Sequence, residues 1–539
     1  MRWSSGVGGW DMAERHTREG YYIVGEGMLG TPATPPGTAL AMSMEADLRA
    51  FRFSRMGPKG RQLGEPNRRR IAGSMTNDLD EKKRDSTVPA GFTYLGQFLD
   101  HDLTFDKSTL VDDGTVPVAD LIQGRSPSLD LDSLYGLGPT LTPDFYSDGV
   151  RLKIGATMKA DFPLDGIANK PQPGFDLPRR ANRKARIPDI RNDENLVVGQ
   201  THLAFIRFHN RVVDKLAADG VPSASLFTTA RETVVRHYQW MIRTDYLPRV
   251  VKPQLVDSVF TEGRKVFETA PVPGDAPTMP VEFSVAAFRL GHSMIRVAYD
   301  WNHVFDDGGG SLDFLFEFSG TSGTLAGGSR LPSNWIADFR RLYDFTEAGR
   351  NDLRPIVRGR SKLQFARRID TLLADPLANL PPGSIGGPEP VDARRNLAFR
   401  NLTRAGMLQL ATGQQMLALM RSRGVTVTAL TPAKIRDGNG GAALTALNPA
   451  QRAALLKDTP LWFYALREAE FNGGHLAGVG GRIVAETFHR AMEGSQISIL
   501  ADPTWRPSLG PDPTTFRMVD LLLFAFEGRE ELLNPLGDG

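Results

Sequence analysis

One histidine, His101, stands between two acidic side chains, Asp100 and Asp102, and four residues after a glutamine, Gln97. On a helix, residues four apart share a face, so Gln97 and His101 would lie together while the two aspartates point to either side. Polar groups of this kind are costly to bury without partners. The segment alone is therefore explained either by an ordinary polar surface or by a reactive site. The other segments of the chain distinguish the two interpretations.

A second segment alternates oxygen-bearing and apolar residues. Ser126, Ser128, Asp130 and Asp132 occupy every second position of a short stretch. In an extended loop such oxygens can converge on one hard cation, which suits calcium. The stretch lacks the spacing and the glycine of an EF-hand loop, so an acidic surface turn is the alternative interpretation.

Three further segments carry polar side chains in a suggestive context. Arg191 and Glu194 stand three residues apart, as do Arg289 and His292. Asn401 is a polar residue within an apolar stretch. Residues three apart on a helix are neighbours, but each pair alone is equally explained by a charge pair at a helix start or by a structural histidine.

Taken together and in this order, the five segments resemble the animal-type haem peroxidases of the peroxidase–cyclooxygenase superfamily, particularly their bacterial, myeloperoxidase- or lactoperoxidase-like members. The motifs that carry the resemblance are residues 96–102, 126–136, 191–194, 288–292 and 401–404. Residues 245–248 and 481–486 also resemble family segments, so the resemblance extends over about residues 85–530. Each motif is modest, but five in register are very specific.

The resemblance implies a haem b cofactor and gives roles to three residues on its peroxide side. His101 is expected to move a proton between the peroxide oxygens, which suits a neutral imidazole. Arg191 is expected to stabilise the charge that develops as the O–O bond breaks, and Gln97 to hold water or a halide. Hydrogen peroxide would be reduced to water through compound I, at the expense of bromide, iodide, thiocyanate or phenolic donors.

On the other side of the haem, His292 resembles the proximal iron ligand. Asn401 is expected to accept a hydrogen bond from the second ring nitrogen of His292, and Arg289 to meet a haem propionate. Asp100 and Glu194 match the carboxylates that, in this family, become ester-linked to haem methyl groups.

The resemblance also identifies Asp102 as the calcium ligand that ties the distal helix to the alternating loop. Ser126, Asp130 and Asp132 are expected to supply side-chain oxygens, and Ser128 its backbone carbonyl. The negative charge of Asp132, where the family often has serine, should favour the cation.

Two departures from related proteins bear on the reaction. Asn195 stands where the myeloperoxidase branch has a methionine that forms a third, sulfonium link, so no such link and weaker chloride oxidation are expected. Arg289 stands where the fatty-acid dioxygenases of the superfamily have their radical-forming tyrosine. Such a dioxygenase is nevertheless the closest rival to a peroxidase. A non-catalytic adhesion or matrix protein on this scaffold is a second rival, and a metal-dependent hydrolase that uses residues 100–102 is a third.

Helices must position these residues. Apolar residues recur at helical spacing over residues 203–216, and similar patterns cover residues 230–240, 394–420, 449–471 and 480–492. Strand-like alternation is scarce. We therefore predict a mainly α, single large helical peroxidase-type domain over residues 71–539, with long proline- and glycine-rich loops, preceded by an irregular arm, residues 1–70, packed on it.

Composition excludes several classes of function. The 539-residue chain has 64 basic and 62 acidic residues and a net charge of +2, so nothing favours a nucleic acid or an anionic membrane as partner. The absence of cysteine excludes disulfides, thiolate catalysis and a cysteine-ligated haem. No stretch reaches the roughly 18 apolar residues of a membrane helix, and no signal peptide is seen. A monomer that is cytoplasmic, or exported without a leader, is expected.

Two minor features complete the sequence-based expectations. The densest basic cluster, residues 179–186, is interrupted by prolines and is expected to be a solvated loop. Of the nine histidines, only His101 and His292 lie in the motifs; His209 is expected to be structural, and His202 and the others receive no role.

Overall fold

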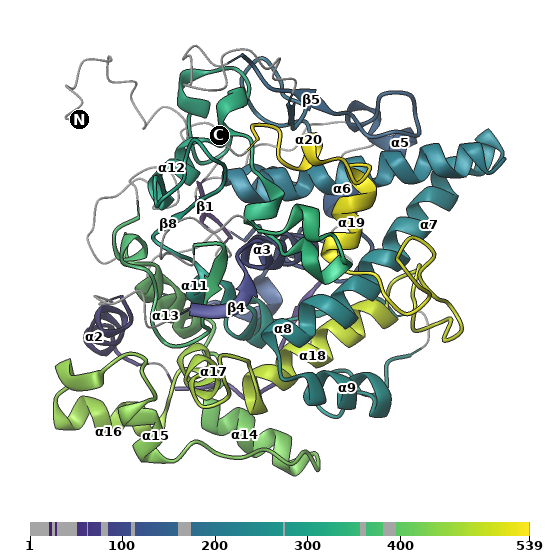
Figure 1. Ribbon diagram of the computed structural model, residues 1–539. Helices are drawn as coiled ribbons and strands as arrows, with labels where there is room; N and C mark the ends of the chain where they lie inside the picture. The colour runs from purple at the N-terminus through teal and green to yellow at the C-terminus, as the bar shows by residue number, and fades with distance from the viewer. Residues whose placement is uncertain are drawn as a thin grey trace, which may run out of the picture.

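In the computed structural model of the protein, the described residues are 21–23, 27–29, 51–61, 63–76, 85–108, 114–159, 174–272, 275–355, 363–380 and 395–537. Helices dominate these residues (Figure 1). The longer helices are α2 (Glu65–Met75), α3 (Gly91–Leu103), α6 (Leu196–Ala218), α7 (Ser223–Met241), α9 (Pro253–Glu262), α13 (Leu397–Met407), α14 (Gly413–Ser422), α16 (Pro449–Lys457), α17 (Leu461–Glu470), α18 (Gly478–Glu493) and α19 (Met518–Ala525). The shorter helices are α4 (Asp132–Tyr135), α5 (Gly138–Leu141), α8 (Leu247–Val250), α10 (Val281–Ser284), α11 (Gly291–Met294), α12 (Leu312–Glu317), α15 (Pro432–Asp437) and α20 (Glu530–Leu533).

Strands contribute little to the described part of the chain. They form two-stranded sheets of two to five residues per strand, of which only the β3–β7 pair is parallel. The pairs are β1 (Tyr21–Ile23) with β2 (Gly27–Leu29), β3 (Phe53–Ser54) with β7 (Met279–Pro280), β4 (Asp85–Pro89) with β10 (Phe365–Arg367), β5 (Gly155–Ala156) with β6 (Phe175–Asp176), and β8 (Ala298–Tyr299) with β9 (Gly310–Ser311). The predicted mainly α fold is confirmed.

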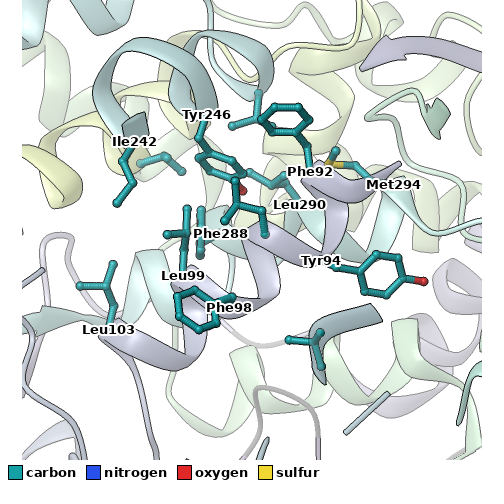
Figure 2. Packing of buried hydrophobic residues seen from close by; sticks show 14 of the residues in the cluster. Phe92, Tyr94, Phe98, Leu99, Leu103, Ile242, Tyr246, Phe288, Leu290 and Met294 are labelled. Carbon is teal, nitrogen blue, oxygen red and sulfur yellow. The ribbon is translucent and has the colours of Figure 1, made fainter. Parts of the chain in front are cut away.

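Helix α3 lies at the centre of the core and is buried along most of its length. Phe98 stacks on Phe205 of α6, with the ring centroids 4.5 Å apart. Figure 2 shows Leu99 of α3 in the same packed apolar cluster as Tyr246, which belongs to the π turn η6 (Ile242–Tyr246) after α7. Gly96 permits the close approach of Tyr246 to α3, because a Cβ atom there would lie 2.4 Å from the Tyr246 hydroxyl. The helix that carries His101 is thus clamped between elements distant in sequence.

The predicted helical segments 230–240 and 480–492 are confirmed as α7 and α18. The segments 394–420 and 449–471 each form two helices instead of one. In the first, Gln409 adopts a positive φ of 47° and Thr412 caps α14 through a capping box with Gln415. In the second, Pro460 precedes α17, because proline cannot continue the hydrogen-bond ladder of α16.

Part of the predicted N-terminal arm lies outside the described residues. Within it, β3 pairs with β7, and the buried carboxylate of Glu282 accepts hydrogen bonds from the backbone N–H groups of Met56 and Gly57. The last residues of the predicted arm belong to α2, whose helix continues past residue 70. The boundary at residue 70 stays a prediction. Among the described residues, no helix has the length and apolar character needed to cross a membrane.

Candidate functional site

A pocket lies between α3 and the segment around α11, and its empty space, including the part open to solvent, is about 860 Å³. Gln97 and His101 enter it from the face of α3 that their spacing predicts, and Asp100 lines it as well. Glu194 comes from the turn before α6, and His292 comes from α11. The apolar part of the wall includes Phe288, Ile295, Leu312, Phe316, Leu377, Leu380 and Leu397. A mostly apolar cavity with a few convergent polar groups has the character of a ligand site.

Burial disfavours the charged forms of three titratable side chains of this cavity, His101, Glu194 and Asp100. Burial lowers the pKa of His101 to about 3, and the positive charge of Arg191 contributes. Burial raises the pKa of Glu194 to about 8 and that of Asp100 to about 6, although Arg191 opposes both shifts. His101 Nε2 lies 3.7 Å from Glu194 Oε2. Because these two groups are mainly uncharged near pH 7, this approach is not an ion pair there.

Gln97 is fixed by two neighbours. Its Nε2 donates to Glu194 Oε2 at 2.8 Å, and its Oε1 accepts from Asn195 Nδ2 at 2.9 Å. Asn195 also caps α6, because its Oδ1 accepts from the backbone N–H of Val198 at 3.0 Å. The sequence indicated only that Asn195 replaces a methionine of the family, whereas in the structure it orients Gln97. Asparagine is a preferred helix N-cap residue, and this preference could have indicated its second role.

Arg191 lies behind the end of α3 and is not among the residues that line the cavity. Its Nη2 donates to the carbonyl oxygens of His101 at 3.1 Å and Thr104 at 2.7 Å. Asp189 accepts from its Nε at 3.0 Å and from its Nη2 at 2.7 Å. Burial would raise the pKa of Asp189, but Arg191 and then Arg125 outweigh it and hold that pKa well below its usual value. Sequence reasoning missed Asp189, which stands two residues before the arginine.

Arg179 corrects the expectation of a solvated basic loop. Its guanidinium is buried and pairs with Asp176 at 2.7 Å and with Asp193 at 2.6 Å. It thereby anchors the 3₁₀ turn η5 (Ile190–Asp193), which carries Arg191. Elsewhere in the cluster the expectation holds, since the side chain of Arg180 is 48% exposed. Local composition could not show that two aspartates, one of them fourteen residues away, cover a single arginine.

His292, Asn401 and Arg289 form a connected group on the second side of the cavity. Asn401 Nδ2 lies 2.9 Å from His292 Nδ1, and Asn401 Oδ1 accepts from Arg289 Nη1. The predicted contact between Asn401 and His292 is therefore present, but the amide presents its donor to the ring instead of its acceptor. The guanidinium has only donors and takes the single acceptor atom of the amide. Burial lowers the pKa of His292 to about 3.

Asp102 points away from the cavity, towards α4 and α7. Its Oδ1 accepts from Ser133 Oγ at 2.7 Å, and its Oδ2 accepts from Tyr238 Oη at 3.0 Å. Burial, and then the charge of Asp132, raise its pKa to about 7. Asp130 and Asp132 each have one buried carboxylate oxygen, Oδ1, without a hydrogen-bond partner among the described residues. In the part of the chain that the structure describes, no three His, Asp or Glu side chains are grouped closely enough to hold a metal ion.

Comparison with known proteins adds an independent finding. Residues 111–308 match the family model of the animal haem peroxidases. The chain contains an animal haem peroxidase domain. The matched residues include Arg191, Glu194 and His292, whereas His101 and Asn401 lie outside them.

Individual proteins extend this comparison. A peroxidase-like protein from Margaritifera margaritifera is 32% identical over 121 residues, which are 22% of this chain and 15% of that protein. Peroxidase A from Dictyostelium discoideum is 16% identical, with a TM-score of 0.53 over 84% of this chain and 88% of that one. A fatty acid alpha-dioxygenase from Oryza sativa is 11% identical, with a TM-score of 0.46 over 90% of this chain and 80% of that one. The likeness to peroxidase A shows that the haem peroxidase fold extends over most of the chain.

The Asp189–Arg191 pair yields a stability prediction. Asp189→Asn leaves two buried guanidinium groups, Arg191 and Arg125, without their shared carboxylate. We expect the free energy of unfolding at pH 7 to fall by about 3–5 kcal/mol, as when one partner of a buried pair is removed. Urea-induced unfolding of wild type and of Asp189→Asn at pH 7 measures this difference in free energy.

The control is Asp148→Asn, which removes a pair with Arg151 whose side chains are 45% and 37% exposed. Its effect should stay below about 1 kcal/mol. Because the pKa of Asp189 is depressed in the folded chain, its contribution is present above the unfolded pKa of about 3.9 and is lost as the pH falls further. Equal unfolding midpoints for wild type and Asp189→Asn at pH 7 would contradict this account of the site.

Proposed function

We propose that this protein is a haem peroxidase that reduces hydrogen peroxide to water and takes electrons from small donors, either halides and thiocyanate or phenols. The observation that carries the proposal is the cavity into which His101 and His292 enter from two different helices. One imidazole is then available to bind iron and the other to handle the peroxide proton. A metal-dependent hydrolase using Asp102 is disfavoured, because that carboxylate faces Ser133 and Tyr238.

The residues present fit a haem group. The lining of the cavity is largely apolar. A Cβ atom at Gly291, next to His292, would meet nothing within 4 Å among the described residues, so there is room for a broad, flat group beside the ring. When bound, haem supplies an iron that binds peroxide and exchanges electrons with the reducing substrate.

His292 would bind the iron, with Arg289 and Asn401 beside it. Ligation through Nε2 leaves the ring proton on Nδ1, which needs an acceptor. Asn401 therefore has to turn its Oδ1 towards His292, and Arg289 has to release that oxygen. A haem propionate would offer the guanidinium a stronger, charged acceptor. We propose that the two rearrangements occur together.

His101 would move the peroxide proton. It is uncharged near pH 7, so it has a free lone pair, and an imidazole can return the proton to the departing oxygen. Gln97 gives one amide hydrogen to Glu194, which leaves the second for water or a halide. Arg191 would act through its field, because its Nε and Nη2 groups donate to backbone carbonyls and to Asp189 and it does not line the cavity. Its effect on His101 and Glu194 is already visible in their pKa values.

Absorption spectra of the purified, haem-loaded protein test this function. We expect a Soret band that shifts on adding peroxide. His101→Leu should keep the haem but slow the peroxide reaction by about 10²–10⁴-fold, the usual contribution of a general base, and His292→Ala should lower haem affinity. His489→Gln, outside the cavity lining, is the matched control and should behave as wild type.

Failure of the wild-type Soret band to respond to peroxide would contradict the proposal and support a non-catalytic protein on this scaffold. Rapid oxygen uptake with linoleate would instead support a fatty-acid dioxygenase, although Arg289 occupies the position of that enzyme's tyrosine. Turnover with bromide, iodide, thiocyanate and a phenol would rank the donors.

Covalent attachment of haem is a separate part of the proposal. Asp100 and Glu194 both line the cavity, and burial makes them hold a proton more readily than ordinary carboxyls do. We propose that each would form an ester with a haem methyl group during the first peroxide turnovers: a C–H bond of the methyl group would be replaced by a C–O bond to the carboxyl, and peroxide would take up the two electrons and the two protons as it is reduced to water. Acid–acetone should then fail to extract haem from turned-over wild type and should extract it from the Asp100→Asn/Glu194→Gln double variant. Complete extraction from the wild type would contradict the esters.

Calcium is proposed for the loop of Ser126, Ser128, Asp130 and Asp132, together with Asp102. The support is the buried group of acidic side chains and the Oδ1 atoms of Asp130 and Asp132, which have no partner among the described residues. Burial, and then neighbouring negative charges, raise the pKa of Asp130 well above its usual value. A bound cation would supply the counter-charge that this group of carboxylates needs in order to be ionised.

Asp130→Asn tests the calcium proposal. With calcium present, we expect bound calcium and the unfolding temperature to fall, because a ligand charge is lost. With a chelator present, the same variant should be more stable than wild type, because a buried repulsion is relieved. Asp120 is an exposed residue just before the loop, and Asp120→Asn should change neither the bound calcium nor the unfolding temperature. An unfolding temperature of wild type that does not respond to calcium would contradict the site.

A further inference from the structure

Behind His101 lies a buried chain of three polar side chains. His101 Nδ1 lies 2.9 Å from Asn192 Oδ1, and Asn192 Nδ2 lies 3.0 Å from His202 Nδ1. The three residues come from α3, from the turn η5 and from α6, and they are 1%, 0% and 0% exposed. Neither Asn192 nor His202 lines the cavity, so any effect they have on its chemistry must pass through His101.

This chain has a direction, because an amide has one end that accepts and one that donates. A neutral imidazole carries one proton, and the partner of each nitrogen decides where it resides. Asn192 Oδ1 can only accept, so it places the His101 proton on Nδ1. The unprotonated Nε2 is then left on the side of Glu194 and the cavity. Asn192 Nδ2 can only donate, so His202 must accept at Nδ1 and carry its own proton on Nε2.

Rigid surroundings hold Asn192 in place. The turn that carries it is fixed on one side by the Asp189–Arg191 pair and on the other by the Arg179–Asp193 pair. His202 packs edge-on against Phe98, with ring centroids 5.8 Å apart. Its Nε2 is buried and has no hydrogen-bond partner in the described structure. A buried nitrogen without a partner lowers the stability of the folded chain. An apolar side chain at this position would avoid that loss, so packing alone does not explain a histidine here.

We infer that Asn192, backed by His202, is a positioning residue that sets the proton of His101 on Nδ1 and so keeps Nε2 free to receive the proton of hydrogen peroxide. With the amide reversed, Nε2 would carry a proton towards the cavity and His101 could not act as a base. The inference deepens the proposed function and rests on it for the role of His101. It adds two residues to which the family motifs in this sequence assign nothing.

The proton positions can be read directly in the full-length chain labelled with nitrogen-15 histidine. Correlation of ring nitrogens with carbon-bound ring protons distinguishes protonated from unprotonated nitrogen, and His101→Gln and His202→Gln assign the signals. We expect the proton of His101 on Nδ1 and that of His202 on Nε2. The opposite arrangement at His101 in the wild type would overturn the inference.

Two variants of Asn192 separate positioning from packing. In Asn192→Asp the carboxylate accepts from both rings, so His101 should keep its proton on Nδ1 while the proton of His202 moves from Nε2 to Nδ1. In Asn192→Leu, His101 loses its acceptor and should become a mixture of both tautomers. An unchanged His202 in Asn192→Asp, or an unchanged His101 in Asn192→Leu, would overturn the inference.

Cyanide gives a functional readout that is not turnover, because hydrogen cyanide must give up its proton to a distal base as it binds ferric haem. Asn192→Leu should slow cyanide association at least about tenfold, within the range of general-base effects, and Asn192→Asp should stay within about threefold of wild type. Asn210→Leu is the matched control: it removes an asparagine of α6 that bonds the backbone of Leu152, away from the cavity. It should leave the cyanide rate unchanged.

Equal slowing by Asn192→Leu and Asn210→Leu would overturn the inference in favour of general destabilisation. Failure of the proposed function is distinguishable from this. It would be seen as absent haem binding or absent peroxide reaction in the wild type, whereas the proton positions are measured in the chain without haem.

Discussion

The pairing of Arg191 with Asp189 is the interaction on which the rest of the site depends. The guanidinium donates to two carbonyl oxygens at the end of α3, at His101 and Thr104, while the carboxylate also holds Arg125. A planar group with five donors can bridge several acceptors at once, which a lysine could not do in the same geometry. The last turn of α3, which carries His101, and the turn before α6 are therefore joined. Charge buried in this way must stay paired, which makes the junction rigid.

Burial in this mostly apolar cavity shifts the pKa values of its acids and its base in the direction that favours their uncharged forms. His101 resists protonation, and Glu194 and Asp100 resist ionisation, for the same reason, which is burial. Surroundings that disfavour charge suit a large apolar cofactor, and they keep His101 able to accept a proton without being permanently charged. Arg191 remains charged nearby but turned towards protein acceptors, so its field reaches the cavity while its hydrogen bonds serve the scaffold.

Amide side chains decide the proton positions on both sides of the cavity. Asn192 presents its oxygen to His101, and Asn401 presents its nitrogen to His292 while Arg289 takes its oxygen. The first arrangement leaves a lone pair in the cavity. In the proposed haem-bound protein the second arrangement would reverse, so loading of the cofactor and release of Arg289 are expected to be coupled. The same residue type thus gives one histidine a fixed state and the other a state that depends on the ligand.

Residue types and their spacing along the sequence were enough to predict the mainly α fold, the helix through residues 97–102, and the shared face of Gln97 and His101. These are local properties, since the 3.6-residue period places neighbours on one face whatever surrounds the helix. The partners of those residues were decided only by the tertiary structure. Asn192 contacts His101 from 91 positions away and Asn401 contacts His292 from 109 positions away, so no local period could indicate either contact or which end of each amide would face the ring.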